Sequence, residues 1–249
     1  MERDRCRLSD QQWAAYLREA RQGKERSQLF HDMVRTDLLR CGPGATLLDI
    51  GCGRGIQTGR VLQESLATAA DRFIGVEPDG EVAVSDCFCQ VHRCTLEDAP
   101  LPAGSIDVAM AAFVLEHVAA PERFFSKLHE ILGDGGVFWA MTIDKRHPFA
   151  LCSSMAQRTG LKSPFLAWVR RGGPAEEMET YPTFYRSNTP RALTRYAAAF
   201  RQRRWMSFHF VGQYDPYLPP ALRRCAHVVD RLAARLRLPG PTAVVRLQK

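Results

Sequence analysis

Residues 47–59 read Leu-Leu-Asp-Ile-Gly-Cys-Gly-Arg-Gly-Ile-Gln-Thr-Gly, an apolar run that ends in an acid and then turns through alternating glycines. Glycine adopts the backbone conformations that a tight turn needs, and it lets a ligand lie close to the main chain. The pattern predicts a buried strand, a nucleotide-binding loop and the start of a helix whose first amides have no intrahelical partners. The loop contains Gly51, Gly53 and Gly55, with Cys52 between the first two.

Two neighbouring predicted strands each end in an acid. Asp49 lies at the end of the first strand, and Glu77 ends the second apolar run, Phe73-Ile74-Gly75-Val76-Glu77. Because a carboxylate at Asp49 would repel a phosphate, the loop suits a cofactor with a cationic amine and a sulfonium but no phosphate. Glu77 suits the two hydroxyls of a ribose.

Five segments of the chain resemble the motifs of the class I S-adenosylmethionine-dependent methyltransferases, in the order that this family has them. The segments are residues 49–55, 77, 105–108, 114–118 and 132–136. The resemblance spans roughly residues 45 to 143 and implies S-adenosylmethionine as the cofactor. The cofactor-binding residues expected on this basis are Asp49, Gly51, Cys52, Gly53, Gly55, Glu77, Thr95, Leu96 and Ala112. A doubly wound domain that binds another nucleotide, or none, is the alternative.

One position departs from the family's pattern. Where the family often has an aspartate that bonds the adenine amine, this chain has Thr95. A threonine hydroxyl can accept a hydrogen bond at that place, and the backbone around Leu96 can contact the ring whatever the side chain. Glu97 or Asp98 could substitute for the missing acid.

Apolar runs and helical patterns alternate through the middle of the chain. Strands are expected near 46–50, 72–77, 89–94, 106–111 and 137–143, and helices near 56–69, 80–86 and 121–132. The alternation predicts an α/β fold. Together with the resemblance, it implies a doubly wound, mainly parallel seven-stranded sheet of the Rossmann-like methyltransferase type. Ligands in such sheets bind beyond the carboxyl ends of the strands.

Further elements flank this core. Ser9 is expected to cap a helix with Trp13, Tyr16 and Leu17 on one face, and a second helix follows near 24–40. These helices either cover the ligands or pack on the sheet. Later elements are a helix near 191–200, a strand near 204–212, a helix from Pro220 to about Leu236 and a strand near 242–247. The resemblance implies that the last two strands form an antiparallel pair at one edge.

The sequence predicts that the chain divides into four regions. Residues 1–44 form N-terminal helices, 45–144 the cofactor-binding core, 145–190 a cap inserted after the fifth strand, and 191–249 the rest of the core sheet with an extra helix. The cap is expected to bind the substrate because a connection of this length between core elements is usually functional or disordered. Its aromatic content argues against disorder.

Several residues are candidates for work on the acceptor. His147 follows the fifth strand and is the expected general base, since histidine takes a proton near neutral pH. A purely structural role in the turn is the alternative. Tyr181, Tyr185 and Arg186 are expected to line the acceptor site, while His117 is expected to be structural.

The extra helix is basic and amphipathic. Arginines alternate with an apolar stripe whose members are Leu222, Ala226, Val229, Leu232, Ala233 and Leu236. Such a helix can lie on an anionic membrane. The expectation is instead that its apolar side packs on its own domain, so peripheral membrane contact is the alternative.

Composition limits the remaining classes. The net charge of +7 permits an acidic partner without requiring one. No apolar run of about 18 residues and no secretory signal is present, so a cytoplasmic protein with reduced cysteines is expected. Cys87, Cys89, His92 and Cys94 cluster in ligand types that suit zinc. They contain no Cys-x-x-Cys pair, and we expect no metal site.

The expected reaction is methyl transfer to a small-molecule acceptor, at an oxygen atom rather than at nitrogen or carbon. Family members that methylate amides in nucleic acid or protein commonly carry an Asn/Asp-Pro-Pro-Tyr-type motif after the fourth strand. This chain reads Ala111-Ala112-Phe113-Val114 there, so no stable nucleic-acid partner is expected. The alternatives are an RNA methyltransferase that uses the basic surface and a non-catalytic binding protein on this fold.

Overall fold

The computed structural model describes residues 8–53, 55–56, 59–147, 150–151, 155, 159, 181–209, 220–236 and 238–249. Its helices and strands alternate along the chain as the sequence predicts. The elements are α1 (Asp10–Arg21), α2 (Arg26–Cys41), β1 (Thr46–Ile50), α3 (Val61–Ala67), β2 (Arg72–Val76), β3 (Gln90–His92), η1 (Leu96–Asp98), β4 (Ile106–Ala112), η2 (Leu115–His117), α4 (Pro121–Ile131), β5 (Leu132–Ile143), α7 (Pro190–Tyr196), β6 (Gln202–Phe208), α8 (Pro220–Arg235) and β7 (Thr242–Gln248).

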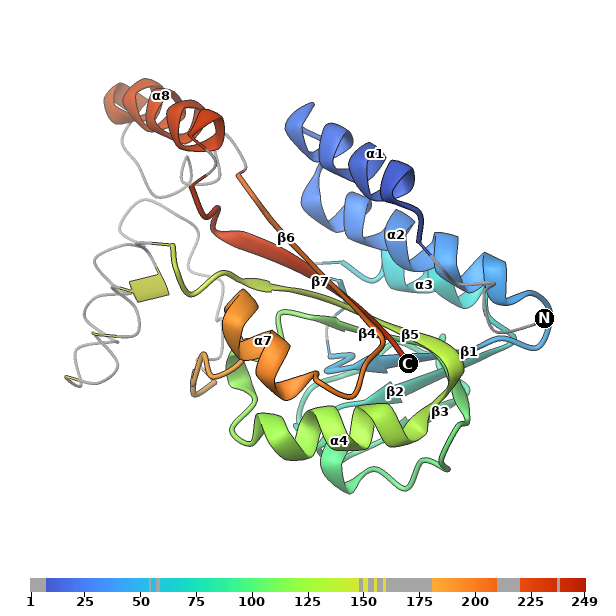
Figure 1. Ribbon diagram of the computed structural model, residues 1–249. Helices are drawn as coiled ribbons and strands as arrows, with labels where there is room; N and C mark the ends of the chain where they lie inside the picture. Colours follow the sequence, from blue (N-terminus) through green and yellow to red (C-terminus); the bar gives the residue numbers. More distant parts are fainter. Residues whose placement is uncertain are drawn as a thin grey trace.

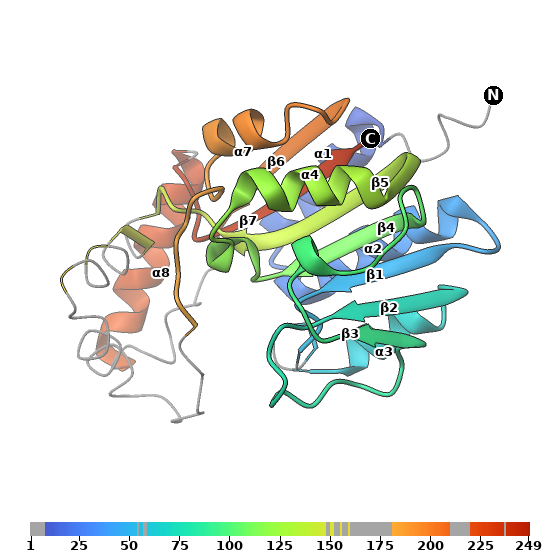
Figure 2. The same cartoon turned by 90° about the horizontal axis from the view of Figure 1, so that it is seen from below.

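The strands form one sheet in the order β3-β2-β1-β4-β5-β7-β6, seven strands within the described residues. The pairs from β3 to β5 are parallel, and β7 runs antiparallel to both β5 and β6. Figure 1 shows α1, α2 and α3 on one face of the sheet and α4 and α7 on the other. Figure 2 shows the strands from β3 to β5 side by side. The doubly wound fold and the antiparallel pair at one edge are therefore confirmed.

Alternate residues of β5 face the two helical layers. Trp139 points toward the N-terminal helices, where its ring stacks on Trp13 with centroids 6.3 Å apart and meets Tyr16 edge-on. Phe138 points to the opposite face and meets Phe124 of α4. This alternation follows from the pleat of a strand, whose successive side chains point to opposite faces. The N-terminal helices thus pack on the sheet, and Ser9 caps α1 through a capping box, as predicted.

The prediction of a helix near 80–86 is wrong. Residues 77–89 contain neither helix nor strand. The Asp79 side chain accepts the amide of Glu81, which forms a local turn. Arg93 donates to the carbonyl oxygens of Asp79 and Val82, both at 2.9 Å, so a side chain occupies acceptors that a helix would use. The helix expected near 56–69 begins only at Val61.

A buried ion pair joins α2 to the antiparallel edge of the sheet. Asp37 Oδ2 accepts Nε of Arg246 at 2.8 Å and Nε1 of Trp139 at 2.9 Å, while Oδ1 accepts a guanidinium nitrogen of Arg40. The side chains of Asp37 and Arg246 are fully buried. The geometry satisfies both carboxylate oxygens, which buried charge requires.

Asp37→Ala should lower the free energy of unfolding by about 3–5 kcal/mol, because it leaves the Arg246 guanidinium buried without its anion. Urea unfolding followed by circular dichroism measures this loss. Asp10→Ala is the matched control: Asp10 of α1 pairs with Arg204 of β6, but its carboxylate is exposed. That change should cost about 0–1 kcal/mol. Equal losses for the two variants would contradict the structural role of the buried pair.

Candidate functional site

The glycine loop is fixed to the ends of the central strands. The amides of Gly51 and Cys52 donate to the carbonyl oxygen of Val76, at 2.7 and 3.2 Å. Gly51 has φ of +71°, and a Cβ there would lie 2.5 Å from a methyl carbon of Val114. Residue 51 must therefore be glycine for two reasons, backbone conformation and contact with the segment after β4. The loop follows β1 at the carboxyl edge of the sheet and contacts the end of β2 and the segment after β4.

Glu77 holds this loop through its carboxylate. Oε2 accepts the amide of Gly53 at 2.9 Å, and Oε1 accepts the amide of Asp79 at 3.0 Å. The residue is 7% exposed. A carboxylate has about four lone-pair positions, so two bonds leave acceptor capacity for ligand hydroxyls. Glu77 is thus placed both to shape the loop and to accept hydroxyl donors beside it.

Asp49 is a buried acid on the central strand, and its main partner is Gln63 of α3. Nε2 of Gln63 donates to Asp49 Oδ2 at 2.6 Å and to the carbonyl oxygen of Cys52 at 2.9 Å. Burial raises the pKa of Asp49 to about 7, the bond from Gln63 opposes this rise, and the charge of Glu77 adds to it. Among the described residues no lysine or arginine forms an ion pair with Asp49.

Gln63 also presents an unused acceptor. Because its nitrogen faces two acceptors, its amide orientation is determined, and Oε1 points elsewhere. Oε1 is buried and has no hydrogen-bond partner among the described residues. A buried acceptor without a partner is costly. Together, Asp49 and Gln63 form an acceptor-rich place beside the loop, and Asp49 in its ionised form would suit a cationic amine that donates hydrogen bonds.

The other predicted cofactor residues lie on the same edge in different surroundings. Cys52 is buried against Gly75, and burial raises the pKa of its thiol to about 12, so it is no nucleophile. The Thr95 hydroxyl donates to Asp98 at 2.9 Å and is exposed. Leu96 is buried in the core, and Ala112 ends β4 half-buried. Gly55 has φ of +102°, and a Cβ there would meet the backbone of residue 59.

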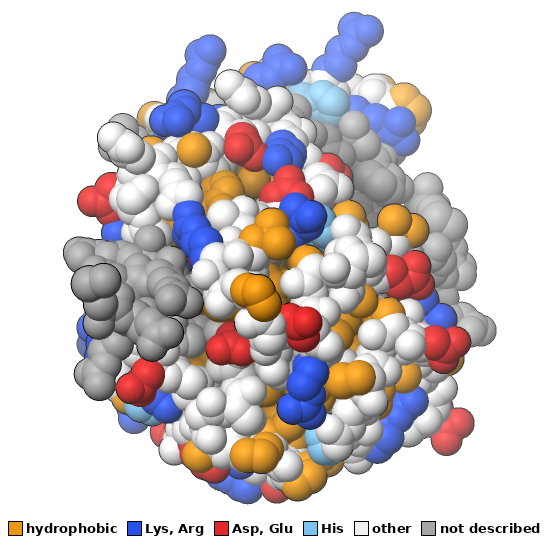
Figure 3. Space-filling view, turned by 90° about the vertical axis from the view of Figure 1, so that its right-hand side faces the viewer, with side chains coloured by type: hydrophobic (Ala, Val, Ile, Leu, Met, Phe, Trp, Pro, Cys, Tyr) orange, Lys and Arg blue, Asp and Glu red, His pale blue; other side chains and the backbone are white. Residues whose placement is uncertain are grey.

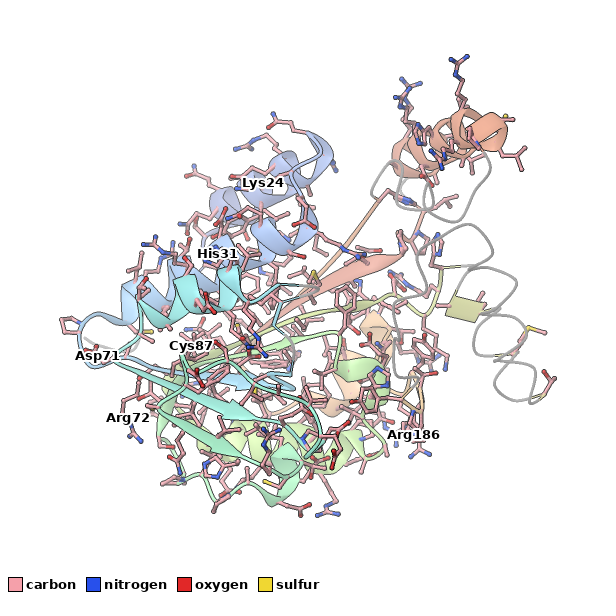
Figure 4. All side chains as sticks on the ribbon, turned by 180° about the vertical axis from the view of Figure 1, so that it is seen from behind. Lys24, His31, Asp71, Arg72, Cys87 and Arg186 are labelled. Carbon is pink, nitrogen blue, oxygen red and sulfur yellow. The ribbon has the colours of Figure 1, made fainter. Side chains whose placement is uncertain are left out.

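The described end of the expected cap, residues 181–188, crosses this edge of the sheet. The Tyr181 hydroxyl donates to Asp79 at 2.5 Å, after β2. His117 Nδ1 lies 2.7 Å from the carbonyl oxygen of Pro182, so Nδ1 carries the proton. Arg186 donates to the carbonyl oxygen of residue 119. Figure 4 shows Arg186 at the opposite side of the molecule from Asp71 and Arg72, where β2 begins. Residues 148–149, 152–154, 156–158 and 160–180 of the expected cap lie outside the described residues.

A buried polar chain pins this segment to the sheet, and the sequence did not reveal it. The Thr142 hydroxyl donates to Glu116 Oε2 at 2.7 Å, and Asn188 Nδ2 donates to Thr142 Oγ1 at 2.7 Å. The backbone oxygen of Glu116 accepts the amides of Phe184 and Tyr185. Burial raises the pKa of Glu116. Glu116 belongs to a family-like segment, but nothing in the pattern showed that its side chain would meet Thr142 and Asn188.

His147, the predicted base, lies at the turn after β5. Its amide donates to the carbonyl oxygen of Asp144 at 3.0 Å, and its side chain is half-buried. Burial lowers the pKa of His147, and His209 lowers it further, while Asp144 opposes this. The imidazole is therefore neutral near pH 7 and able to accept a proton.

The described residues offer neither a metal centre nor a membrane span. In the part of the chain that the structure describes, no three His, Cys, Asp or Glu side chains lie close enough together to hold a metal ion. Among the described helices, none has the length and apolar character needed to cross a membrane.

Comparison with known proteins identifies related chains. The model of the methyltransferase domain family matches residues 17–208. The ubiquinone biosynthesis O-methyltransferase of Bradyrhizobium sp. (strain ORS 278) is 28% identical over 142 residues, which are 54% of this chain and 52% of that protein. The chain spans about half the length or less of the first curated relatives that it matches.

Solved structures share the fold. A SAM-dependent methyltransferase from Archaeoglobus fulgidus has a TM-score of 0.54 at 16% identity, over 94% of this chain and 99% of that one. Geranyl diphosphate C-methyltransferase from Streptomyces coelicolor A3(2) has a TM-score of 0.53 at 15% identity, over 88% and 74%. At these identities the likeness concerns the fold alone.

Asp49→Asn should stabilise the protein at pH 8 more than at pH 5. The folded pKa of Asp49 is raised, so burial of its ionised form costs free energy that appears as pH rises from about 4 through about 7. The asparagine cannot ionise, so the gain at pH 8 should be on the order of a few kcal/mol and shrink at pH 5. Urea unfolding at both pH values measures the difference. Asp86→Asn, at an exposed acid, is the control. A pH-independent difference for Asp49→Asn would contradict the buried carboxylate.

Proposed function

Because this chain belongs to the class I S-adenosylmethionine-dependent methyltransferase family, we propose that it transfers a methyl group from S-adenosylmethionine to an oxygen atom of a small molecule. The observation that carries the proposal is the buried pair of Asp49 and Gln63 beside the glycine loop. It presents a carboxyl group and an amide oxygen that has no hydrogen-bond partner among the described residues. No lysine or arginine of the described residues forms an ion pair with Asp49. S-adenosylmethionine, when bound, supplies an activated methyl group on a sulfonium.

Residues of the chain fit that cofactor at both ends. Asp49 and the Gln63 amide oxygen would accept from the cationic amine, and ionised Asp49 is favoured once a positive charge lies near it. Glu77 would accept from the ribose hydroxyls with the lone pairs that its two backbone bonds leave. A Cβ at Gly53 would lie 3.1 Å from Glu77 Oε2, so glycine at this position keeps the space beside the proposed ribose acid open. Thr95 and Leu96 are proposed for the adenine.

A small acceptor under residues 181–188 is supported by how this segment lies. It crosses the carboxyl edge of the sheet. Tyr181 at one end of the segment bonds Asp79 after β2, and Asn188 at the other end bonds Thr142 of β5, which in turn bonds Glu116. Tyr181, Tyr185 and Arg186 belong to this segment and are proposed to line the acceptor site. The relative from Bradyrhizobium is named an O-methyltransferase, which supports oxygen as the acceptor atom.

Methyl transfer from a sulfonium requires positioning of the reactants and, for a hydroxyl acceptor, removal of one proton. Holding acceptor and donor in line can supply about 7–11 kcal/mol of the barrier, so positioning is the main task. We propose that His147 takes the proton of the acceptor hydroxyl as the oxygen attacks, which contributes about 10²–10⁴-fold. Its lowered pKa keeps the ring neutral for this step.

The face of the molecule drawn in Figure 3 does not favour the RNA alternative. On the face drawn in Figure 3, basic and acidic side chains are interspersed over the body of the molecule. A binding groove for nucleic acid usually gathers basic side chains on one face.

Glu77→Gln should weaken binding of S-adenosylhomocysteine by about 1.5–3 kcal/mol, the scale of a hydrogen bond to a charged group. The change keeps the shape and removes the charge. Isothermal titration calorimetry measures the affinity, and Glu81→Gln, at an exposed acid nearby, is the matched control. If both variants bind as the parent does, Glu77 is not the ribose acid.

Incubation with methyl-labelled S-adenosylmethionine and a cell extract tests the proposed reaction. We expect label in the small-molecule fraction, in an O-methyl group of the product. Label in RNA, or in an N-methyl or C-methyl group of a small molecule, would contradict the proposal. With the purified acceptor, His147→Ala should lower kcat about a hundredfold or more without a change in cofactor affinity. His129→Ala, on α4, is the control; an unchanged kcat in His147→Ala would remove the base role.

A further inference from the structure

Helix α8 presents its apolar stripe to solvent. Leu222, Val229, Leu232 and Leu236 are spaced by seven, three and four residues, so they lie on one side of the helix. Their exposed fractions are 53%, 64%, 53% and 63%, and the neighbouring Val228 is 61% exposed. In a surface helix of a globular protein such a stripe ordinarily faces the core. The expectation that the stripe packs on its own domain is therefore wrong.

The more buried side of α8 carries polar side chains, beside Ala226 and Ala233 of the stripe, which are half-buried. Asp230 is the buried residue of this helix, and Arg223 and His227 lie partly buried on the same side, seven and three residues before it. Asp230 is also the single acid in residues 220–236. Its carboxyl group is therefore buried and adds no negative charge to the solvent-exposed surface of α8.

The exposed charges of α8 are all positive. Arg224, Arg231 and Arg235 are exposed and form a row beside the apolar stripe. Figure 4 shows side chains that end in nitrogen pointing from α8 away from the rest of the molecule. The solvent side of the helix therefore combines an apolar row with a parallel cationic row along about 24 Å, at 1.5 Å per residue.

The place of α8 in the fold exposes this surface at one end of the molecule. The helix lies between β6 and β7 in the chain, and β7 begins at Thr242 opposite Ile143, the last residue of β5. It therefore lies toward the carboxyl edge of the sheet. Figures 1 and 2 show it apart from the layers of α1 and α2 and of α4. Among the described elements, none packs extensively against α8.

We propose that α8 docks on the surface of an anionic lipid bilayer, with its apolar stripe inserted at the interface and its arginine row against the headgroups. Basic amphipathic helices with this arrangement lie in the interface plane rather than across the membrane. The charge argues for lipid over a second copy of the chain, because pairing two α8 surfaces would bring their arginine rows together. The inference stands on the surface of α8 and does not depend on the proposed reaction.

Sedimentation of the full chain with vesicles tests the proposal. The vesicles are phosphatidylcholine alone, or phosphatidylcholine with about one third phosphatidylglycerol. We expect binding to the anionic vesicles, weakened by salt, and little binding to neutral ones. Arg224→Gln, Arg231→Gln and Arg235→Gln combined should weaken binding by on the order of a hundredfold. Val229→Ser with Leu232→Ser should weaken it by about tenfold or more.

Matched variants elsewhere separate this surface from general charge and hydrophobicity. Arg18, Arg21 and Arg35 are exposed on α1 and α2, and their combined change to glutamine alters the net charge equally. Leu39 and Val61 are exposed apolar residues of α2 and α3, to be changed to serine. Both control sets should bind as the parent does. Equal losses in the control sets, no binding to anionic vesicles, or a dimer in sedimentation velocity that the α8 variants dissociate would overturn the proposal.

Discussion

The carboxylate of Asp49 is kept out of water in the middle of the sheet, and the site is arranged around it. Its strand is central, with β2 and β4 on either side. Gln63 brings α3 against it and also holds the loop at Cys52, while Glu77 holds the same loop at Gly53. Two acids and the glycine loop thus face one edge, where a cation would relieve the electrostatic cost.

A comparison with Asp37 shows what is particular about Asp49. Both are buried in the same domain, but Asp37 meets the guanidinium groups of Arg246 and Arg40 and the indole of Trp139, so its charge is compensated within the protein. Asp49 has the neutral amide of Gln63 instead. The ion pairs of Asp37 stabilise the fold, and this role accounts for its burial. Asp49 destabilises the folded chain when ionised, and a ligand that carries positive charge gives it a function.

The sequence predicted the features that depend on local pattern. The alternating runs identified the sheet. The turn at Gly51 was evident because a positive φ favours glycine, and Glu77 was evident as the acid that ends the second apolar run. Contacts between distant segments were not predictable: Gln63 with Asp49, and Glu116 with Thr142 and Asn188, join parts of the chain that pattern treats separately. The direction in which α8 faces was also missed, because periodicity identifies an apolar side without saying what covers it.

Proton release on cofactor binding tests the central claim most directly. If Asp49 has a pKa of about 7 in the free protein and meets a cation in the complex, its pKa falls on binding and a proton leaves near pH 6.5. Calorimetric titration of S-adenosylhomocysteine in buffers of different ionisation enthalpy counts that proton. The account predicts release of a substantial fraction of a proton in the parent protein and a loss of that release in Asp49→Asn. Equal proton release by the two proteins, or none by the parent, would contradict it.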